Sequence, residues 1–161
     1  MPNKASVADT IAQARLVSPT GFAMALHIRF TSPTFLFQSY PGEWISEYTG
    51  RGLHLQDPNV IWGFTNEGWI RWSELAKQDP AGVIMAAGRH GMCYGAAIGL
   101  MRNGSRSIGG FSRGDREFTD EELVELTKLL ELAHDQTEGS SVVTAADQRA
   151  LREMSVRMTH N

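Results

Sequence analysis

Residues 40–72 read YPGEWISEYTGRGLHLQDPNVIWGFTNEGWIRW, and this stretch concentrates aromatic rings around one aspartate that precedes a proline. Tyr40, Trp44 and Tyr48 follow one another at intervals of four residues. Pro41 suits the first turn of a helix, because its missing N–H has no partner there in any case. Side chains four residues apart lie on one face of a helix. The spacing therefore predicts a helix that begins at Pro41 and carries an aromatic row.

The aromatic row is apolar in body but carries hydrogen-bond donors at its tips. A buried Tyr hydroxyl or Trp indole N–H needs a polar partner. Asp57 is an acceptor when ionised, and Pro58 pushes its backbone toward an extended conformation. Donors and one acceptor among rings indicate a pocket for a small, mostly apolar molecule with an amide or ester head group. The same spacing is also typical of plain hydrophobic core, and Asp-Pro commonly starts a turn or helix.

The joint pattern resembles the autoinducer-binding domain of LuxR-type quorum-sensing regulators, the receptors for N-acyl homoserine lactones. That family carries Tyr-Pro-x-x-Trp-x-x-x-Tyr, then Asp-Pro nine residues after the second Tyr, then a Trp fifteen residues after the Asp. In register with this motif are Tyr40, Pro41, Trp44, Tyr48, Asp57, Pro58 and Trp72. A Gly-x-x-Tyr-Gly pattern and a later Gly-x-x-Ser pattern are matched by Gly91, Tyr94, Gly95, Gly109 and Ser112. The sequence departs from many members at Gly99, where they carry a proline.

The resemblance implies a role for each polar group toward an N-acyl homoserine lactone. Trp44 would donate its indole N–H to the lactone carbonyl, and Asp57 would accept the amide N–H. Tyr40 would donate its hydroxyl to the amide carbonyl, which Ser112 would support directly or through water. Tyr48 would pack against the acyl chain.

Further residues would surround the ligand by the same resemblance. Trp72 and Trp69 would wall the lactone ring. On the sheet beneath, the acyl chain would be faced by Leu26, Ile28, Thr34 and Leu36, although each of these positions also suits plain core. The lactone is a ligand, and neither a cofactor nor a metal site is expected.

Length and composition are typical of one soluble globular domain. The chain has 161 residues, of which 42% are hydrophobic and 20% charged, and this length can bury a continuous core. The net charge of −3 argues against nucleic-acid binding by this portion, because phosphate backbones favour a basic stripe. The single Cys93 excludes an internal disulfide and a thiolate-rich zinc site. No apolar run is long enough for a membrane span and no signal peptide is recognised, so a cytoplasmic location without membrane contact is expected.

Periodicity and turn signals predict both helices and strands. Helices are predicted at residues 5–17, 41–51, 66–77, 83–87 and 119–134, with residues 60–64 as a short apolar turn. Thr119 and Glu122 form a capping box before the last helix. Two antiparallel hairpins are predicted, from residues 22–30 with 34–37 and from residues 91–100 with 108–112. With the resemblance, these elements imply an α+β fold: an α-β-α sandwich with a mostly antiparallel sheet of about five strands and a cavity between sheet and helices.

Two segments are expected along the chain. Residues 1–138 are predicted as the autoinducer-binding domain, and residues 139–161 as a linker and the start of a truncated helix-turn-helix DNA-binding domain. A complete module needs three to four helices. We therefore interpret the chain as a fragment of a transcriptional regulator in which the lactone controls DNA binding by a C-terminal module.

Partners follow from the same interpretation. A homodimer formed through the helices from Thr119 onward is expected, with DNA bound only through the C-terminal module. The alternative is a stand-alone receptor-like antagonist that heterodimerises with a full-length regulator and silences it.

An enzyme is the remaining class of function. His90 and Cys93 lie three residues apart, and a Cys–His pair can supply a nucleophile and a base. The position of Cys93 in an apolar run instead predicts a buried structural thiol. Elsewhere the sequence carries no Gly-rich phosphate loop, metal-spaced His cluster or paired-carboxylate motif. We therefore assign no catalytic residue.

Overall fold

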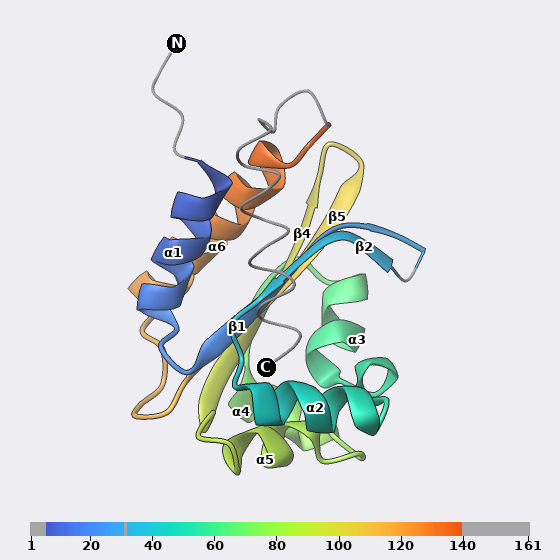
Figure 1. Cartoon of the computed structure of the whole chain (residues 1–161), viewed down its shortest axis with the longest axis vertical. Coiled ribbons are helices and arrows are strands. Elements are labelled where there is room, and N and C mark those ends of the chain that lie inside the picture. Colours follow the sequence, from blue (N-terminus) through green and yellow to red (C-terminus); the bar gives the residue numbers. More distant parts are fainter. Residues whose placement is uncertain (1–5, 31, 140–161) are drawn as a thin grey trace.

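The computed structural model describes residues 6–30 and 32–139, and within them one antiparallel sheet lies between two groups of helices (Figure 1). The five strands follow the order β2-β1-β5-β4-β3. Their bounds are β1 Gly21–Arg29, β2 Ser32–Gln38, β3 Gly68–Arg71, β4 Tyr94–Arg102 and β5 Ser105–Arg113. This arrangement confirms the predicted α+β fold and the α-β-α sandwich.

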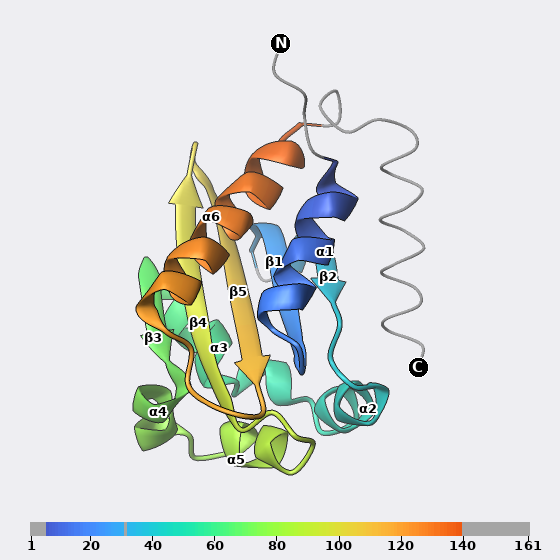
Figure 2. The same cartoon turned by 90° about the vertical axis from the view of Figure 1, so that its left-hand side faces the viewer.

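The helices divide between the two faces of the sheet. Figure 2 shows two long helices lying side by side across one face, α1 (Val7–Val17) and α6 (Asp120–Gln136). The other face and the lower end of the sheet carry α2 (Gly42–Gly50), α3 (Pro58–Thr65), α4 (Trp72–Leu75) and α5 (Val83–Gly88), with short 3-10 turns at η1 (Leu53–Leu55) and η2 (Ala76–Gln78). In the part of the chain that the structure describes, none of the helices combines the length and hydrophobicity that a bilayer span requires.

Alternation along the strands separates two hydrophobic cores, because successive side chains point to opposite faces. The core under α1 and α6 contains large, fully buried side chains, among them Met24, Ile98 and Phe111. The core on the opposite face contains Trp44 and Trp72. The two faces are therefore built from the same strands but from different residue sets.

A bulge in β1 interrupts this alternation. His27 has a left-handed backbone (φ 55°), and the pairing of β1 with β5 shifts register between Ala25 and Ile28. The His27 side chain is held in place, since Nε2–H donates to the carbonyl oxygen of His134 at 2.8 Å and Nδ1 lies 2.7 Å from Ser105 Oγ. The extra residue places Ala25 and Ile28 on the same face.

The second predicted hairpin is confirmed, with a two-residue turn. Asn103 and Gly104 join β4 to β5, and both have positive φ angles of 54° and 72°. A tight hairpin turn of this kind needs left-handed residues, which Asn and Gly adopt most readily. The first predicted hairpin is confirmed as β1 and β2.

The predicted helix over residues 66–77 is wrong, because its first part is strand β3. Gly68 has φ +93°, and the strand pairs with β4 through Trp69 and Ile98. The helix begins only at Trp72. Apolar residues spaced by three match a helix, but a short edge strand followed by one helical turn gives the same spacing. The predicted apolar turn at residues 60–64 is instead part of helix α3.

The capping box of α6 is confirmed. Thr119 Oγ1 accepts from Glu122 N at 3.1 Å, and Glu122 Oε1 accepts from Thr119 N at 2.9 Å. Leu123, Leu126 and Leu130 are fully buried on the face of α6 that packs on the sheet. The predicted helix-turn-helix start lies outside the described residues, apart from the linker residue 139.

Candidate functional site

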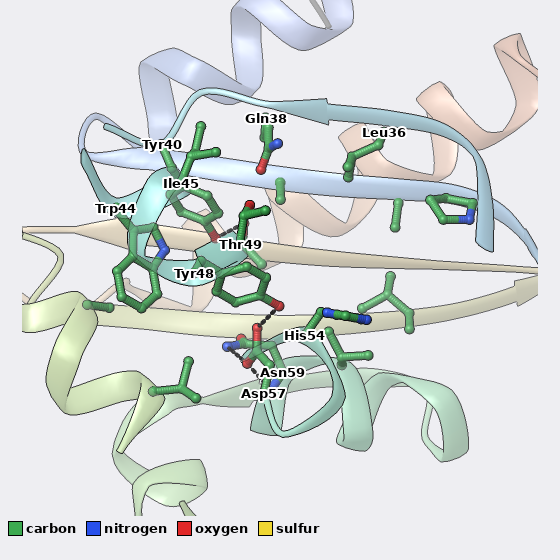
Figure 3. Close-up of a pocket in the computed structure, with 18 of the residues that line it drawn as sticks. Leu36, Gln38, Tyr40, Trp44, Ile45, Tyr48, Thr49, His54, Asp57 and Asn59 are labelled. Atoms are coloured by element: carbon green, nitrogen blue, oxygen red, sulfur yellow. Dashed lines mark hydrogen bonds between the residues drawn. The ribbon is translucent and has the colours of Figure 1, made fainter. Parts of the chain in front are cut away.

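A cavity of about 440 Å³ lies between the sheet and the helices of the second layer (Figure 3). Strands β1, β2 and β5 form its floor, and α2, η1, α3 and α5 form its walls. Its volume falls within the range of small-molecule sites, roughly 300–1,000 Å³. The floor is open because three of its positions carry small residues: Ala23, Ala25 and Gly110.

Most of the residues predicted to bind a ligand line this cavity. They are Tyr40, Trp44, Tyr48, Asp57, Trp72, Ile28 and Leu36. The aromatic row forms because Pro41 precedes α2 and the spacing of four places Trp44 and Tyr48 on the same side of that helix, with ring centroids 5.7 Å apart.

One end of the cavity is polar and is built around Asp57. This residue caps α3, and Asn59 donates to its Oδ1 from both the backbone N–H and the side-chain amide, each at 2.9 Å. The Tyr48 hydroxyl donates to Asp57 Oδ2 at 2.8 Å. The Trp72 indole N–H donates to Asn59 Oδ1 at 2.7 Å. Figure 3 shows Tyr48, Asp57 and Asn59 joined by these bonds.

Burial controls the ionisation of this cluster. Only 7% of Asp57 is exposed, and burial raises the pKa of its carboxyl while hydrogen bonds from Asn59 and Tyr48 act in the opposite direction. Burial, and then the charge of Asp57, raise the pKa of both the Tyr40 and Tyr48 hydroxyls. Both hydroxyls therefore remain protonated donors at neutral pH.

Trp44 differs from its neighbours because its donor is free. The indole is 4% exposed, and its N–H makes no hydrogen bond to any residue that the structure describes. In Figure 3 its nitrogen lies on the side of the ring that faces Tyr40 and Tyr48. The Tyr40 hydroxyl donates to the carbonyl oxygen of Gly110 at 3.1 Å.

Away from the polar cluster most lining residues are apolar. Among them are Ile28, Pro33, Leu36, Leu55, Phe64 and Ile108, and Gln38, Thr49 and His54 also line the cavity. In Figure 3 Leu36 and His54 lie across the cavity from Trp44. The cavity therefore combines a polar cluster, beside which the Trp44 N–H has no partner among the described residues, with a mostly apolar lining elsewhere.

Two sheet residues predicted at the cavity lie elsewhere. Leu26 is fully buried in the core under α1 and α6, because the bulge at His27 places it on the opposite face from Ile28. Thr34 is exposed, and its hydroxyl donates to the His27 carbonyl at 2.8 Å. On these two strands the cavity is lined instead by Ala25 and Ile28 of β1 and by Leu36 and Gln38 of β2.

Trp69 and Ser112 also lie away from the cavity. Trp69 is 36% exposed, and it pairs with Ile98, whose side chain faces α6. Ser112 is buried, and its hydroxyl donates to the Gly21 carbonyl at 2.8 Å and lies 2.7 Å from Thr20 Oγ1. At the Tyr40 hydroxyl the structure places Gly110 instead, where an added Cβ would approach within 3.1 Å.

Sequence reasoning missed several lining residues. Gln38 follows Leu36 by two positions, so the strand period could have identified it. Asn59 carries no comparable signal beyond its place after Asp57 and Pro58, because its role depends on Trp72 from another helix.

His90 and Cys93 do not form the catalytic pair considered above. His90 Nε2 lies 2.8 Å from Glu47 Oε1. The hydrogen bonds from His90 and Arg51 lower the pKa of Glu47. Cys93 is exposed, so the prediction of a buried thiol is wrong. The strand begins one residue later, at Tyr94, which leaves Cys93 in the preceding loop.

Known structures share this fold. SdiA in complex with octanoyl-rac-glycerol aligns with a TM-score of 0.62 and 21% identity, covering 94% of this chain and 69% of that chain. A crystal structure of Escherichia coli SdiA aligns with a TM-score of 0.63 and 20% identity, covering 96% and 74%. The N-acylhomoserine lactone dependent LuxR family transcription factor CepR2 from Burkholderia cenocepacia aligns with a TM-score of 0.58 and 16% identity, covering 80% and 79%.

The family assignment comes from the sequence itself. A search of curated proteins gives no match. Residues 14–136, which are most of the chain, match the family model described as the autoinducer binding domain. These residues contain the whole aromatic motif, the Asp57 cluster and the cavity floor. The chain belongs to the autoinducer-binding domain family, the ligand-sensing domain of LuxR-type quorum-sensing regulators.

Proposed function

We propose that this chain senses an N-acyl homoserine lactone for a quorum-sensing transcriptional regulator. The observation that carries the proposal is that the N–H of Trp44, which has no partner in the described part of the chain, and the carboxylate of Asp57 line one cavity whose remaining lining is mostly apolar. An acyl homoserine lactone has the matching order of groups: a ring carbonyl, an amide and a hydrocarbon chain.

Each polar group of the ligand has a partner in this proposal. Trp44 donates to the ring carbonyl without breaking any bond to a described residue. Asp57 Oδ2 accepts the amide N–H beside the Tyr48 hydroxyl. The Tyr40 hydroxyl donates to the amide carbonyl after leaving the Gly110 carbonyl. That bond is long for an O–H donor, at 3.1 Å, so the exchange costs little.

The acyl chain would occupy the apolar end. Burial of each methylene contributes about 0.8 kcal/mol, or about fourfold in affinity, until the cavity is filled. SdiA forms a complex with octanoyl-rac-glycerol, an octanoyl ester, which supports an acyl ligand of this size for the fold. Bound only by the folded state, the lactone would stabilise it by RT ln(1 + [L]/Kd).

Isothermal calorimetry and thermal unfolding with N-octanoyl homoserine lactone test the proposal. We expect saturable binding, a rise in Tm with ligand concentration, and weaker binding by about fourfold for each methylene removed from the chain. Octanoic acid controls for the chain alone, and 1-octanoyl-rac-glycerol for an ester without the amide N–H. Recovery of intact lactone by mass spectrometry separates a receptor from a hydrolase. Equal responses to all three compounds would contradict the head-group assignment.

The same proposal includes regulation. A homodimer would carry a C-terminal helix-turn-helix module, and lactone binding would control its attachment to DNA. Light scattering of the chain with and without N-octanoyl homoserine lactone tests the dimer, and a monomer under both conditions would contradict it.

A further inference from the structure

The side chain of Asn59 connects the Asp57 carboxylate to the Trp72 indole at the polar end. Its side-chain amide donates to Asp57 Oδ1 at 2.9 Å, and its oxygen accepts the Trp72 indole N–H at 2.7 Å. Its backbone N–H also donates to Asp57 Oδ1 at 2.9 Å. With Tyr48 on Asp57 Oδ2, these bonds form one continuous chain from α2 through α3 to α4.

Glycines on the sheet make room for this chain of bonds. A Cβ at Gly95 would collide with the Trp72 ring, so only glycine lets the indole reach Asn59. A Cβ at Gly110 would lie 3.6 Å from Asn59 Oδ1 and 3.1 Å from the Tyr40 hydroxyl, in contact with both. The missing Cβ at Gly95 is therefore what lets the Trp72 indole reach the Asn59 carboxamide.

The hydrogen bonds of the polar end leave few of its donors and acceptors open to a ligand. A carboxylate offers about four acceptor positions. Asn59 fills two of them on Oδ1 and Tyr48 fills one on Oδ2, so Asp57 keeps a single open position, on Oδ2. The single N–H of Trp72 is used by Asn59. Of the two tryptophans lining the cavity, Trp44 alone keeps a free N–H among the described residues.

We propose that Asn59 is a positioning residue of the ligand site: its carboxamide fixes the Asp57 carboxylate and the Trp72 indole, and so leaves one acceptor of Asp57 and the N–H of Trp44 for the ligand. The inference rests on the proposed function, because it assigns how that site selects a head group with one N–H donor and one carbonyl. The backbone N–H of residue 59 is retained in any variant, so the effect of the side chain can be isolated.

Asn59 also affects the charge that Asp57 carries. The groups that face Asp57 or act on it are Tyr40 from the segment before α2, Tyr48 from α2, His54 from η1 across the same cavity, and Asp79 before α5. Burial raises the pKa of Asp57, and the largest opposing effect is the Asn59 side chain. Without that amide, the pKa of Asp57 would rise further and the carboxyl would take up a proton at higher pH. The protonated carboxyl would accept the ligand N–H less well than the carboxylate does.

Two variants isolate the side chain. Asn59→Leu keeps the approximate shape and removes both bonds, whereas Asn59→Ser is small and compatible with the start of a helix but too short to reach Trp72. Asn66→Ser is the matched control, since it makes the same change at the exposed end of the same helix. We expect binding of N-octanoyl homoserine lactone to weaken about tenfold at neutral pH in both Asn59 variants and to stay unchanged in the control.

The pH profile distinguishes positioning from a loss of packing. Affinity for the lactone should fall as pH drops through the Asp57 titration, and in the Asn59 variants this midpoint should move to higher pH. The Trp72 indole N–H resonance should shift in both variants and not in the control. A parallel loss of affinity at every pH, with the indole resonance unchanged, would overturn the proposal.

A measurement on the free wild-type protein does not depend on any variant or ligand. In an NMR titration, the Asn59 side-chain amide and the Trp72 indole N–H should respond at the same midpoint as the Asp57 carboxyl carbon. An indole signal that ignores the Asp57 titration would overturn the proposal even if the lactone binds. If the lactone fails to bind but the three signals titrate together, the positioning role stands and the ligand assignment fails.

Discussion

The two faces of the sheet share the same strands but are filled in opposite ways. Under α1 and α6, Phe22 and Phe111 stack at 6.0 Å between centroids and are fully buried. On the other face, Ala23, Ala25 and Gly110 leave a cavity of about 440 Å³. Strand alternation places the packed core and the cavity on opposite faces, so a substitution should affect either stability or ligand binding according to the face that carries it.

The largest effect is expected from truncation on the filled face. Phe111→Ala should lower the free energy of unfolding by about 3–5 kcal/mol, because it opens a void that the packed core cannot close. Leu36→Ala on the cavity face already borders empty space and should cost about 1–2 kcal/mol. Urea unfolding of the free protein measures both, and equal costs would remove the distinction between the faces.

The next effect comes from enlarging matched alanines. Ala25→Leu should enter the cavity, weaken lactone binding about a hundredfold (~2.7 kcal/mol) and leave the free protein within about 1 kcal/mol of wild type. Ala96→Leu makes the same change in the filled core and should cost about 1–3 kcal/mol of stability with lactone affinity retained. Calorimetry with N-octanoyl homoserine lactone and urea unfolding are the measurements. Similar results for the two variants would refute the separation.

A smaller effect is expected at the polar end. Asp57→Asn should weaken N-octanoyl homoserine lactone binding by about 2 kcal/mol, since it removes a charged acceptor. The raised pKa of Asp57 means that the free wild-type protein loses stability as pH rises from 3.8 through the folded-state pKa. The variant should lack this loss. An unchanged affinity in a thermal-shift titration would show that the amide contact is assigned wrongly.

The smallest effect is expected at the acid that caps α6. Hydrogen bonds from Arg116 lower the pKa of Glu122 to about 2. The stability that the ionised carboxylate contributes is therefore fully present above pH 4.5 and is lost as pH falls toward 2. Glu122→Gln should cost at most about 1 kcal/mol at neutral pH and leave lactone affinity unchanged. Stability curves against pH should therefore slope in opposite directions for Asp57 and Glu122.

Local sequence signals predicted most of the fold. The hairpin predicted from residues 91–100 with 108–112 and the Thr119 capping box depend on nearby residues alone, and both form as expected. The helix expected at residues 66–77 failed because pairing with β4, a tertiary contact, converts its first part to strand. A strand of four residues is too short to show a clear alternating pattern, so the apolar residues spaced by three indicated a helix instead.

Local spacing predicted the part of the candidate site that one helix carries, and the family motif added Tyr40, Asp57 and Trp72. Trp44 and Tyr48 reach the cavity because helical spacing holds them together, and Tyr40 enters it from the segment just before α2. Leu26 was misplaced because a single extra residue in β1 inverts the phase of the strand, and no local pattern announced the bulge. The link between Asn59 and Trp72 was missed because it depends on how two helices meet.

The bulge at His27 ties the register of β1 to helix α6. Its imidazole is held by the end of α6 and by β5, on the side of the sheet away from the cavity. A one-residue deletion there would turn every later inward residue of β1 outward and vice versa. The cavity lining that β1 supplies can therefore change by substitution of its side chains. A change in the length of β1 would also require a new contact with α6 in place of the one that His27 makes.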